Sequence, residues 1–145
     1  MLVVLISPLV LVAVLVVWAR WSLLVVTVRG PSMEPTLRDG DRLLVRRRPL
    51  ARVAVGELVV LAHPAGPDAA FHPAPTGANR GAPTIHSVKR LAGKPGDRVP
   101  GSPGEVVPAG RLWLLGDNPG FSADSRVLGS FSADDLVGTV TRALG

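Results

Sequence analysis

The sequence predicts a mainly β protein, in which a single small antiparallel β domain, sandwich-like or barrel-like, follows one N-terminal transmembrane helix. Its length of 145 residues is about that of one domain. The first 28 residues are almost entirely apolar, whereas the rest of the chain alternates short apolar runs with turns rich in glycine and proline. Hydrophobic residues make up 47% of the chain and charged residues only 19%, a composition that excludes a disordered protein.

The first element expected is a retained membrane anchor over residues 1–28. The stretch Leu2–Val28 is nearly uncharged, and about 20 apolar residues suffice for a helix to cross a bilayer. Trp18 and Trp21 are expected at a membrane interface. The alternative is a cleaved signal peptide, which has a basic N-terminal region, a shorter apolar core and a cleavage site between small residues. No basic residue precedes this long apolar run, which favours the anchor.

The second region, residues 29–145, is expected to form the β domain. No stretch after Val28 shows a long helical period, and about 115 residues are enough for one small core. Residues 63–84 are rich in proline, alanine and glycine and are expected to form a long excursion between two strands. Short apolar runs bounded by turns predict strands at Arg42–Val45, Leu58–Ala62, Ile85–Ala92, Arg111–Leu115 and Leu136–Val140.

The composition also narrows the function. The chain has no cysteine, which excludes disulfide scaffolds, thiolate metal sites and cysteine nucleophiles. With only three histidines as nitrogen ligands, no metal or other cofactor is expected. The net charge is +5, but the arginines are dispersed apart from Arg46–Arg48, and there is no tyrosine to stack on bases. Nucleic acid is therefore not an expected partner.

The first segment that can carry chemistry is Gly30–Leu37, just after the apolar region. Pro31 and Pro35 restrict the backbone on both sides of Ser32. A serine on a rigid turn can be aimed at a substrate, and its N–H can help to line an anion-binding hollow. Taken alone, the segment is better explained as an ordinary turn with a capping serine.

The second segment is Val88–Asp97. If Ile85–Ala92 is a strand, strand alternation places Lys89 on one face. Desolvation lowers the pKa of a core-facing lysine, and a neutral lysine can act as a general base toward a serine hydroxyl. A solvent-facing strand lysine is the alternative, whereas Lys94 lies in a Gly-Lys-Pro-Gly turn and is expected to be exposed.

The third segment, Gly116–Arg126, is a turn-forming loop after an apolar strand. Asp124 and Arg126 are two residues apart and are expected to form an ion pair. In an extended backbone, alternate side chains point to one side, so Ser122 would share a face with this pair. If that face meets Lys89, Ser122 would hydrogen-bond the amine.

Together the three segments resemble the type I signal peptidases of bacteria and their mitochondrial inner-membrane relatives. The motifs Ser-Met-x-Pro-Thr, Lys-Arg-x-x-Gly-x-Pro-Gly-Asp and Gly-Asp-Asn with Ser-x-Asp-Ser-Arg occur in the family's order between Gly30 and Gly129. The resemblance implies a membrane anchor, a β fold and a serine–lysine catalytic dyad. The chain is similar to the shortest members, which lack a large extra domain.

The resemblance also assigns roles to residues. Ser32 would be the nucleophile, with its N–H donating to the oxyanion, and Lys89 its general base; His86 is the next candidate for the base. Some relatives carry a second oxyanion hydroxyl where this chain has Gly30. The remaining roles implied are orientation of the lysine by Ser122, support of the site by the pair Asp124 and Arg126, structural support by Asp117, and substrate contact by Met33.

The function implied is that of a membrane-anchored serine endopeptidase, which cleaves signal peptides or other leader segments after small residues. Its expected partners are a precursor protein or peptide, bound as an extended strand, and membrane lipid. The family resemblance places the domain outside the cytoplasm, although arginines following the anchor would by the charge rule place it inside. Two alternatives remain, namely a maturation protease for one dedicated precursor and an inactive, membrane-anchored β domain that only binds peptides.

Overall fold

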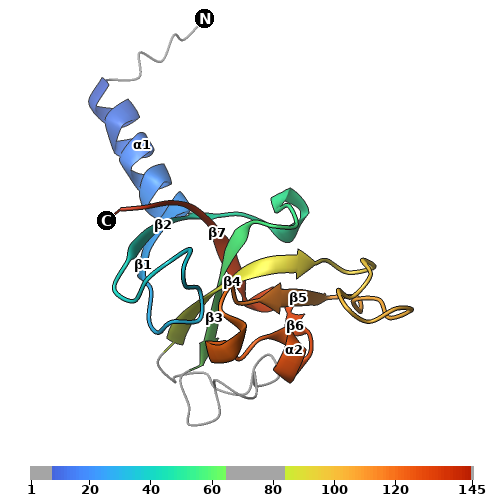
Figure 1. Cartoon of the computed structure of the whole chain (residues 1–145). Helices are drawn as coiled ribbons and strands as arrows, with labels where there is room; N and C mark the ends of the chain where they lie inside the picture. The colour runs from blue at the N-terminus through green and yellow to red at the C-terminus, as the bar shows by residue number, and fades with distance from the viewer. Residues whose placement is uncertain (1–7, 65–83, 145) are drawn as a thin grey trace, which may run out of the picture.

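The computed structural model describes residues 8–64 and 84–144 (Figure 1). In these ranges helix α1 (Pro8–Ser22) precedes seven strands, which form one antiparallel sheet in the order β1-β2-β7-β3-β4-β5-β6. The mainly β prediction is therefore confirmed. The strands are β1 (Leu23–Thr27), β2 (Arg42–Arg47), β3 (Leu58–Pro64), β4 (Thr84–Gly93), β5 (Arg111–Leu115), β6 (Phe131–Ser132) and β7 (Leu136–Ala143). The short helices are η1 (Leu50–Arg52), η2 (Pro119–Phe121), α2 (Ser125–Leu128) and η3 (Ala133–Asp135).

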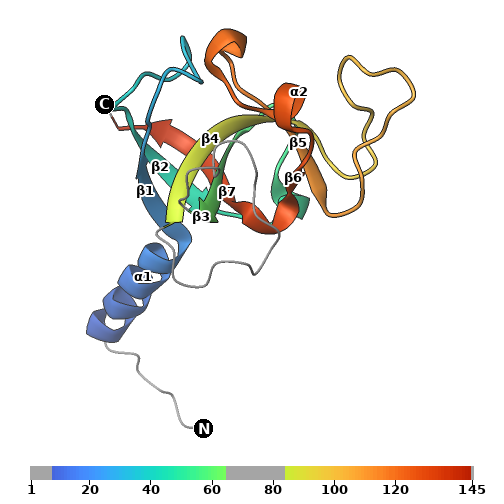
Figure 2. The same ribbon diagram turned by 90° about the horizontal axis from the view of Figure 1, so that it is seen from below.

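Strand β3 lies inside the sheet between β7 and β4, and both of its faces are buried. Its apolar residues therefore follow one another without polar interruption, as expected when both faces of a strand are covered. Figures 1 and 2 show that the sheet is strongly curved. One face packs in a cluster of Val26, Val28, Met33, Leu37, Leu43, Val45, Val60 and Val88. The other face packs in a cluster of Val53, Val59, Leu61, Leu91, Leu112, Leu114 and Phe131.

The N-terminal region differs from the anchor expected over residues 1–28. Helix α1 ends at Ser22, and Leu23–Thr27 forms edge strand β1, paired with β2. Val26 and Val28 are buried in the core, so the end of the apolar run belongs to the β domain. The β-branched valines of this segment suit a strand packed against a partner. Residues 1–7 of the expected anchor lie outside the described residues, and no described helix has the length and apolar character needed to cross a membrane.

All five expected strands are present, and four of them extend beyond the expected ends. The excursion expected over residues 63–84 is shorter at both ends, because β3 reaches Pro64 and β4 starts at Thr84. Residues 65–83, the rest of that excursion, lie outside the described residues. Strands β1 and β6 were not expected. A two-residue strand such as β6 has no periodicity to detect, and β1 continues an unbroken apolar run.

Candidate active site

Lys89 lies near the middle of β4, opposite Val59 of β3, and only 7% of its surface is exposed. Its Nζ donates a hydrogen bond to Ser122 Oγ at 2.9 Å, which is the contact expected from the sequence. Burial lowers the pKa of Lys89 below its ordinary value. The nearby Asp124 carboxylate raises this pKa, and the Arg126 guanidinium lowers it. The amine is thus held in an environment that favours its neutral form.

The turn that carries Ser32 is held from both sides. The Asn118 N–H donates to Ser32 O, and Asn118 Nδ2 donates to Pro31 O, each at 3.0 Å. On the other side, the Gly30 N–H donates to Asp39 Oδ1 at 2.7 Å. Across the described residues, the Ser32 N–H donates no hydrogen bond within the protein, so it is available to a bound group.

Gly116, the residue after β5, lies where the Ser32 turn approaches Ser122, the residue that accepts the hydrogen bond from Lys89. A Cβ at this position would lie 2.0 Å from Ser122 Oγ and 2.7 Å from Ser32 O. Only glycine allows this approach, and it brings the first and third segments together where Ser122 contacts Lys89. No hydrogen bond joins the Ser32 and Lys89 side chains in the described part of the chain.

Asp124 and Arg126 form the expected ion pair, but not through an extended backbone. Asp124 caps α2 by accepting from the Arg126 N–H, and Arg126 Nε donates to Asp124 Oδ1 at 3.0 Å. The Gly116 N–H donates to Asp124 Oδ2 at 2.8 Å. Burial alone would raise the pKa of Asp124, but hydrogen bonds from Arg126, Gly116 and Ser122 outweigh it and lower this pKa to about 2. The expectation of strand-like alternation was wrong, because the helix cap turns the arginine back onto the carboxylate.

Asp117 connects three parts of the site. Its carboxylate accepts from Arg90 Nε at 2.8 Å and Nη2 at 2.6 Å, and from Thr36 Oγ1 at 2.6 Å. The hydrogen bonds from Arg90 lower the pKa of Asp117. Arg90 Nη1 also donates to Gly56 O at 2.7 Å. Asp117 thereby ties the chain beyond Ser32 to strand β4.

The site also contains residues to which the sequence assigned no role. Arg90 and Thr36 contact Asp117, while Asn118 and Gly116 contact the Ser32 turn. Each lies inside one of the motifs, so motif membership was the available signal. Met33, expected to contact substrate, is 1% exposed and belongs mainly to the core.

Beside Ser32 is a hollow of about 70 Å³, which we call the Ser32 hollow. It lies between two strand edges with free backbone groups. Among the described residues, strand β1 pairs with β2 alone, and the Thr84–Lys89 part of β4 pairs with β3 alone, since β5 pairs with β4 only from Arg90 onward. Another strand can therefore be added here. The residues that line the Ser32 hollow are Thr27, Val28, Arg29, Ser32, Met33, His86, Ser87 and Val88.

A family model described as "Signal peptidase, peptidase S26" matches residues 1–106 and 100–144 of this chain. The chain belongs to the signal peptidase family. Members of this family are serine peptidases, and the three motif segments lie within the matched residues.

Individual relatives come from mitochondria and bacteria. Mitochondrial inner membrane protease subunit 1 of Schizosaccharomyces pombe is 33% identical over 109 residues, which cover 69% of this chain and 59% of that protein. The protein of the same name from Xenopus tropicalis is 34% identical over 114 residues, which cover 72% of this chain and 59% of that protein. Signal peptidase I T of Bacillus subtilis is 30% identical over an alignment of 149 residues, which covers 77% of this chain and 68% of that protein. The alignments thus span somewhat more than half of the mitochondrial relatives.

This member of the signal peptidase family has two glycines at critical points of its site. Gly116 is required by the close approach of Ser122 and Ser32 O. Gly30 has no hydroxyl, and its N–H is already bonded to Asp39, so it offers no second donor to an oxyanion at Ser32. Within the described ranges, no group of three or more histidine and carboxylate side chains is arranged to hold a metal ion.

Proposed function

We propose that this chain is a serine endopeptidase that removes leader segments from precursor proteins, with Ser32 as nucleophile and Lys89 as general base. The observation that carries the proposal is the buried Lys89 amine, held by Ser122 beside the Ser32 turn and with a lowered pKa. A neutral amine can take a proton from a serine hydroxyl at near-neutral pH. A surface lysine would be protonated and could not.

The reaction follows from these groups. Lys89 accepts the hydroxyl proton of Ser32 while Oγ bonds to the carbonyl carbon of the scissile peptide. The developing oxyanion accepts a hydrogen bond from the Ser32 N–H, which has no partner elsewhere in the described protein. The carbon–nitrogen bond then breaks, and the leaving amine takes the proton from Lys89. In the second half, water gives a proton to Lys89 and attacks the ester, and Ser32 regains its proton.

The substrate of this reaction binds as an extended strand between β1 and β4. Both strand edges offer backbone groups that no described strand pairs with, and sheet edges recognise extended peptides through such groups. The Ser32 hollow of about 70 Å³ has room for a small side chain only. We therefore propose cleavage next to small residues such as alanine.

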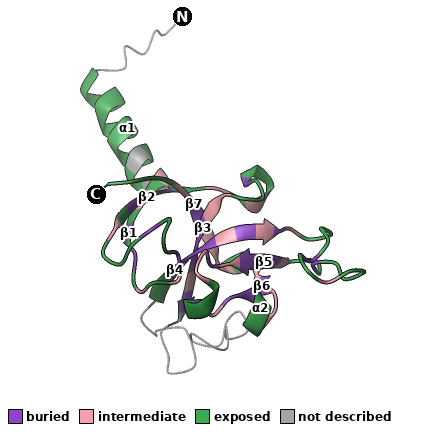
Figure 3. Ribbon diagram, viewed as in Figure 1, coloured by how far each residue is buried: buried purple, intermediate pink, exposed green. Residues whose placement is uncertain are grey.

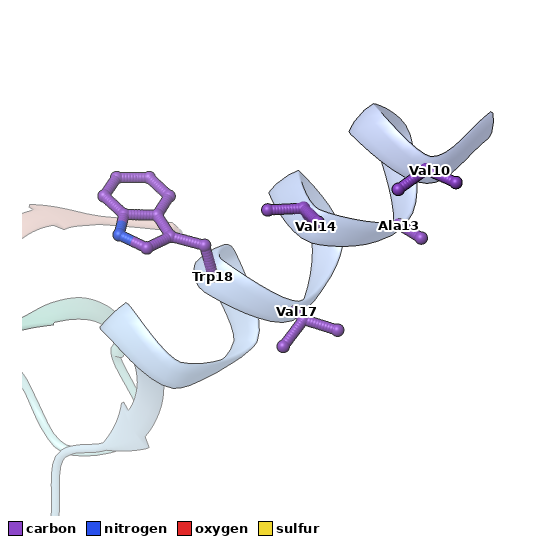
Figure 4. A pocket seen from close by; sticks show the side chains of 5 residues that line it. All are labelled: Val10, Ala13, Val14, Val17 and Trp18. Carbon is purple, nitrogen blue, oxygen red and sulfur yellow. The ribbon is translucent and has the colours of Figure 1, made fainter. Parts of the chain in front are cut away.

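The proposed protease is attached to lipid through α1, with the catalytic domain outside the cytoplasm. The helix projects from the sheet, and residues 8–18 are exposed (Figure 3). On one of its faces a shallow apolar hollow is lined by Val10, Ala13, Val14, Val17 and Trp18 (Figure 4). Apolar surface of this extent is unfavourable in water, and lipid would cover it.

Ser32→Ala tests the nucleophile. The full chain in detergent is incubated with a panel of secretory precursors, and the cleavage sites are determined by mass spectrometry. The wild type is expected to cleave, whereas Ser32→Ala is expected to be inactive while keeping its circular dichroism spectrum. Cleavage by a folded Ser32→Ala protein would exclude Ser32 as the nucleophile. Peptide binding without cleavage by the wild type would instead indicate an inactive relative.

A further inference from the structure

The end of the sheet next to α1 carries three exposed arginines, which we call the arginine collar: Arg20, Arg46 and Arg47. Arg20 lies in the last turn of α1. Arg46 pairs with Leu23, the residue that directly follows the helix, and Arg47 ends β2. Since α1 contacts both β1 and β2, the collar lies at the end of the helix that joins the sheet.

Within the described elements that carry the collar, no negative charge balances it. α1, β1 and β2 contain no aspartate or glutamate. In the described part of the chain the ion pairs are formed by Arg48, Arg90 and Arg126, so none of the three collar arginines takes part in one. The collar is thus a cluster of cationic groups open to an anionic partner.

Apolar surface borders the collar on both sides of the helix end. On β1, Leu23 is 38% exposed and Val25 is 46% exposed. The apolar side chains of α1 are between 49% and 78% exposed, namely Leu9, Val10, Leu11, Val12, Val14, Leu15, Val16, Val17 and Trp18. A continuous apolar element with basic groups at its end matches a bilayer, in which hydrocarbon lies directly below charged headgroups.

We propose that the arginine collar docks the β domain on anionic phospholipid headgroups and so fixes how the Ser32 hollow faces the bilayer. The proposal rests on the proposed attachment of α1 to lipid. When α1 enters the hydrocarbon, its last turn brings the collar to headgroup depth. Figures 1 and 2 show β1 continuing away from α1 toward the Ser32 turn. The five residues of β1 rise about 3.3 Å each before the chain turns, so docking holds Ser32 on the order of 20 Å from the headgroups.

A lipid surface is favoured over an acidic protein or nucleic acid because of this continuity. An acidic partner in solution would satisfy the arginines but leave the adjoining helix uncovered. A bilayer satisfies both surfaces at once. Each arginine near an anionic membrane surface contributes about 1 kcal/mol, which corresponds to a roughly fivefold change in the ratio of docked to undocked domain.

The absence of cysteine allows a direct measurement of docking. Pro49→Cys places a single exposed attachment point two residues after the collar, and a fluorophore there reports proximity to quencher-labelled headgroups. The full chain is reconstituted into vesicles of phosphatidylcholine alone, or of phosphatidylcholine with phosphatidylglycerol. We expect quenching to be stronger with phosphatidylglycerol and to decrease with added salt, because salt screens these charges.

Substitutions of the collar arginines distinguish docking by the collar from a general effect of removing positive charge. Arg46→Gln together with Arg47→Gln should reduce the docked-to-undocked ratio on phosphatidylglycerol vesicles about 25-fold, and the corresponding lysine variants should restore it. Arg98→Gln, in the loop after β4 and far from α1, is the matched control and should change nothing.

Two results would overturn the proposal, and they are distinguishable from each other. Equal quenching on both vesicle types, or an Arg46→Gln, Arg47→Gln protein that docks normally, would exclude the collar while leaving attachment by α1 intact. Failure of the wild type to associate with either vesicle would exclude the attachment itself. Neither result depends on peptide cleavage, which is measured separately in detergent.

Discussion

In the proposed reaction, Lys89 has to lose its charge inside the protein. We predict that Lys89→Arg is as inactive as Lys89→Ala, because a guanidinium stays protonated even when it is buried. Lys94→Ala is the matched control and should keep most activity, since Lys94 lies in the turn after β4, away from Ser122. Cleavage of a peptide substrate measures this. An active Lys89→Arg enzyme would place the base elsewhere, and His86 lines the same hollow.

Arg126 acts on the site through the charge of its guanidinium. It lowers the pKa of Lys89, whereas Asp124 raises it. Removing the arginine charge in Arg126→Gln should raise the pKa of Lys89, so a higher pH is needed to produce the neutral amine. The rising limb of the kcat/KM profile should therefore shift to higher pH. Arg98→Gln controls for the loss of one surface charge, and an unshifted profile for Arg126→Gln would refute the electrostatic role.

The pairing of β2 with β7 depends on one glycine. A Cβ at Gly138 would lie 2.1 Å from Arg46 O, so any side chain here must push the two strands apart. Gly138→Ala should lower the free energy of unfolding by about 1–3 kcal/mol, as overpacking does. Gly120→Ala is the control, since open space surrounds that position. Urea denaturation measures both, and equal stability of the two variants would show that the strands adjust without cost.

At the level of elements, the sequence predicted the strands that are bounded by turns. It did not predict β1, which follows the helix without a turn, or the two-residue strand β6. The run from α1 into β1 is apolar throughout, so helical and strand periods cannot be separated. The boundary at Ser22 is decided by pairing of β1 with β2 and by burial of Val26, both long-range effects. β6 is set by its two pairs with β5 alone.

The site was predicted by its motifs but not by its connections. The family resemblance suggested that Ser122 meets Lys89, and the two-residue spacing suggested that Asp124 pairs with Arg126. The link from Thr36 to Asp117 joins residues 81 positions apart and depends on the shapes of two turns. Such turn geometry has no simple pattern in the residues, so it became evident only from the folded chain.

For the molecule as a whole, acid should remove the stability supplied by its central ion pair. The folded pKa of Asp124 is about 2, below the roughly 3.9 of an unfolded aspartate. Between about pH 4 and pH 2 the unfolded chain binds more protons than the folded chain does. The free energy of unfolding therefore falls as the pH is lowered through this range. Asp117, whose pKa is also lowered, acts in the same direction, whereas the raised pKa of Asp135 opposes them.

Asp124→Asn separates the contribution of Asp124 to the pH dependence of stability from that of the other carboxylates. The variant leaves Arg126 without its counter-charge, so it should be less stable than the wild type at pH 7. Because the amide does not titrate, its stability should depend less steeply on pH between about 4 and 2. Thermal unfolding of both proteins across this range, followed by circular dichroism, measures the two slopes. Parallel slopes would mean that Asp124 titrates equally in the folded and unfolded chains. The ion pair would then hold the loop without linking protonation to the stability of the whole domain.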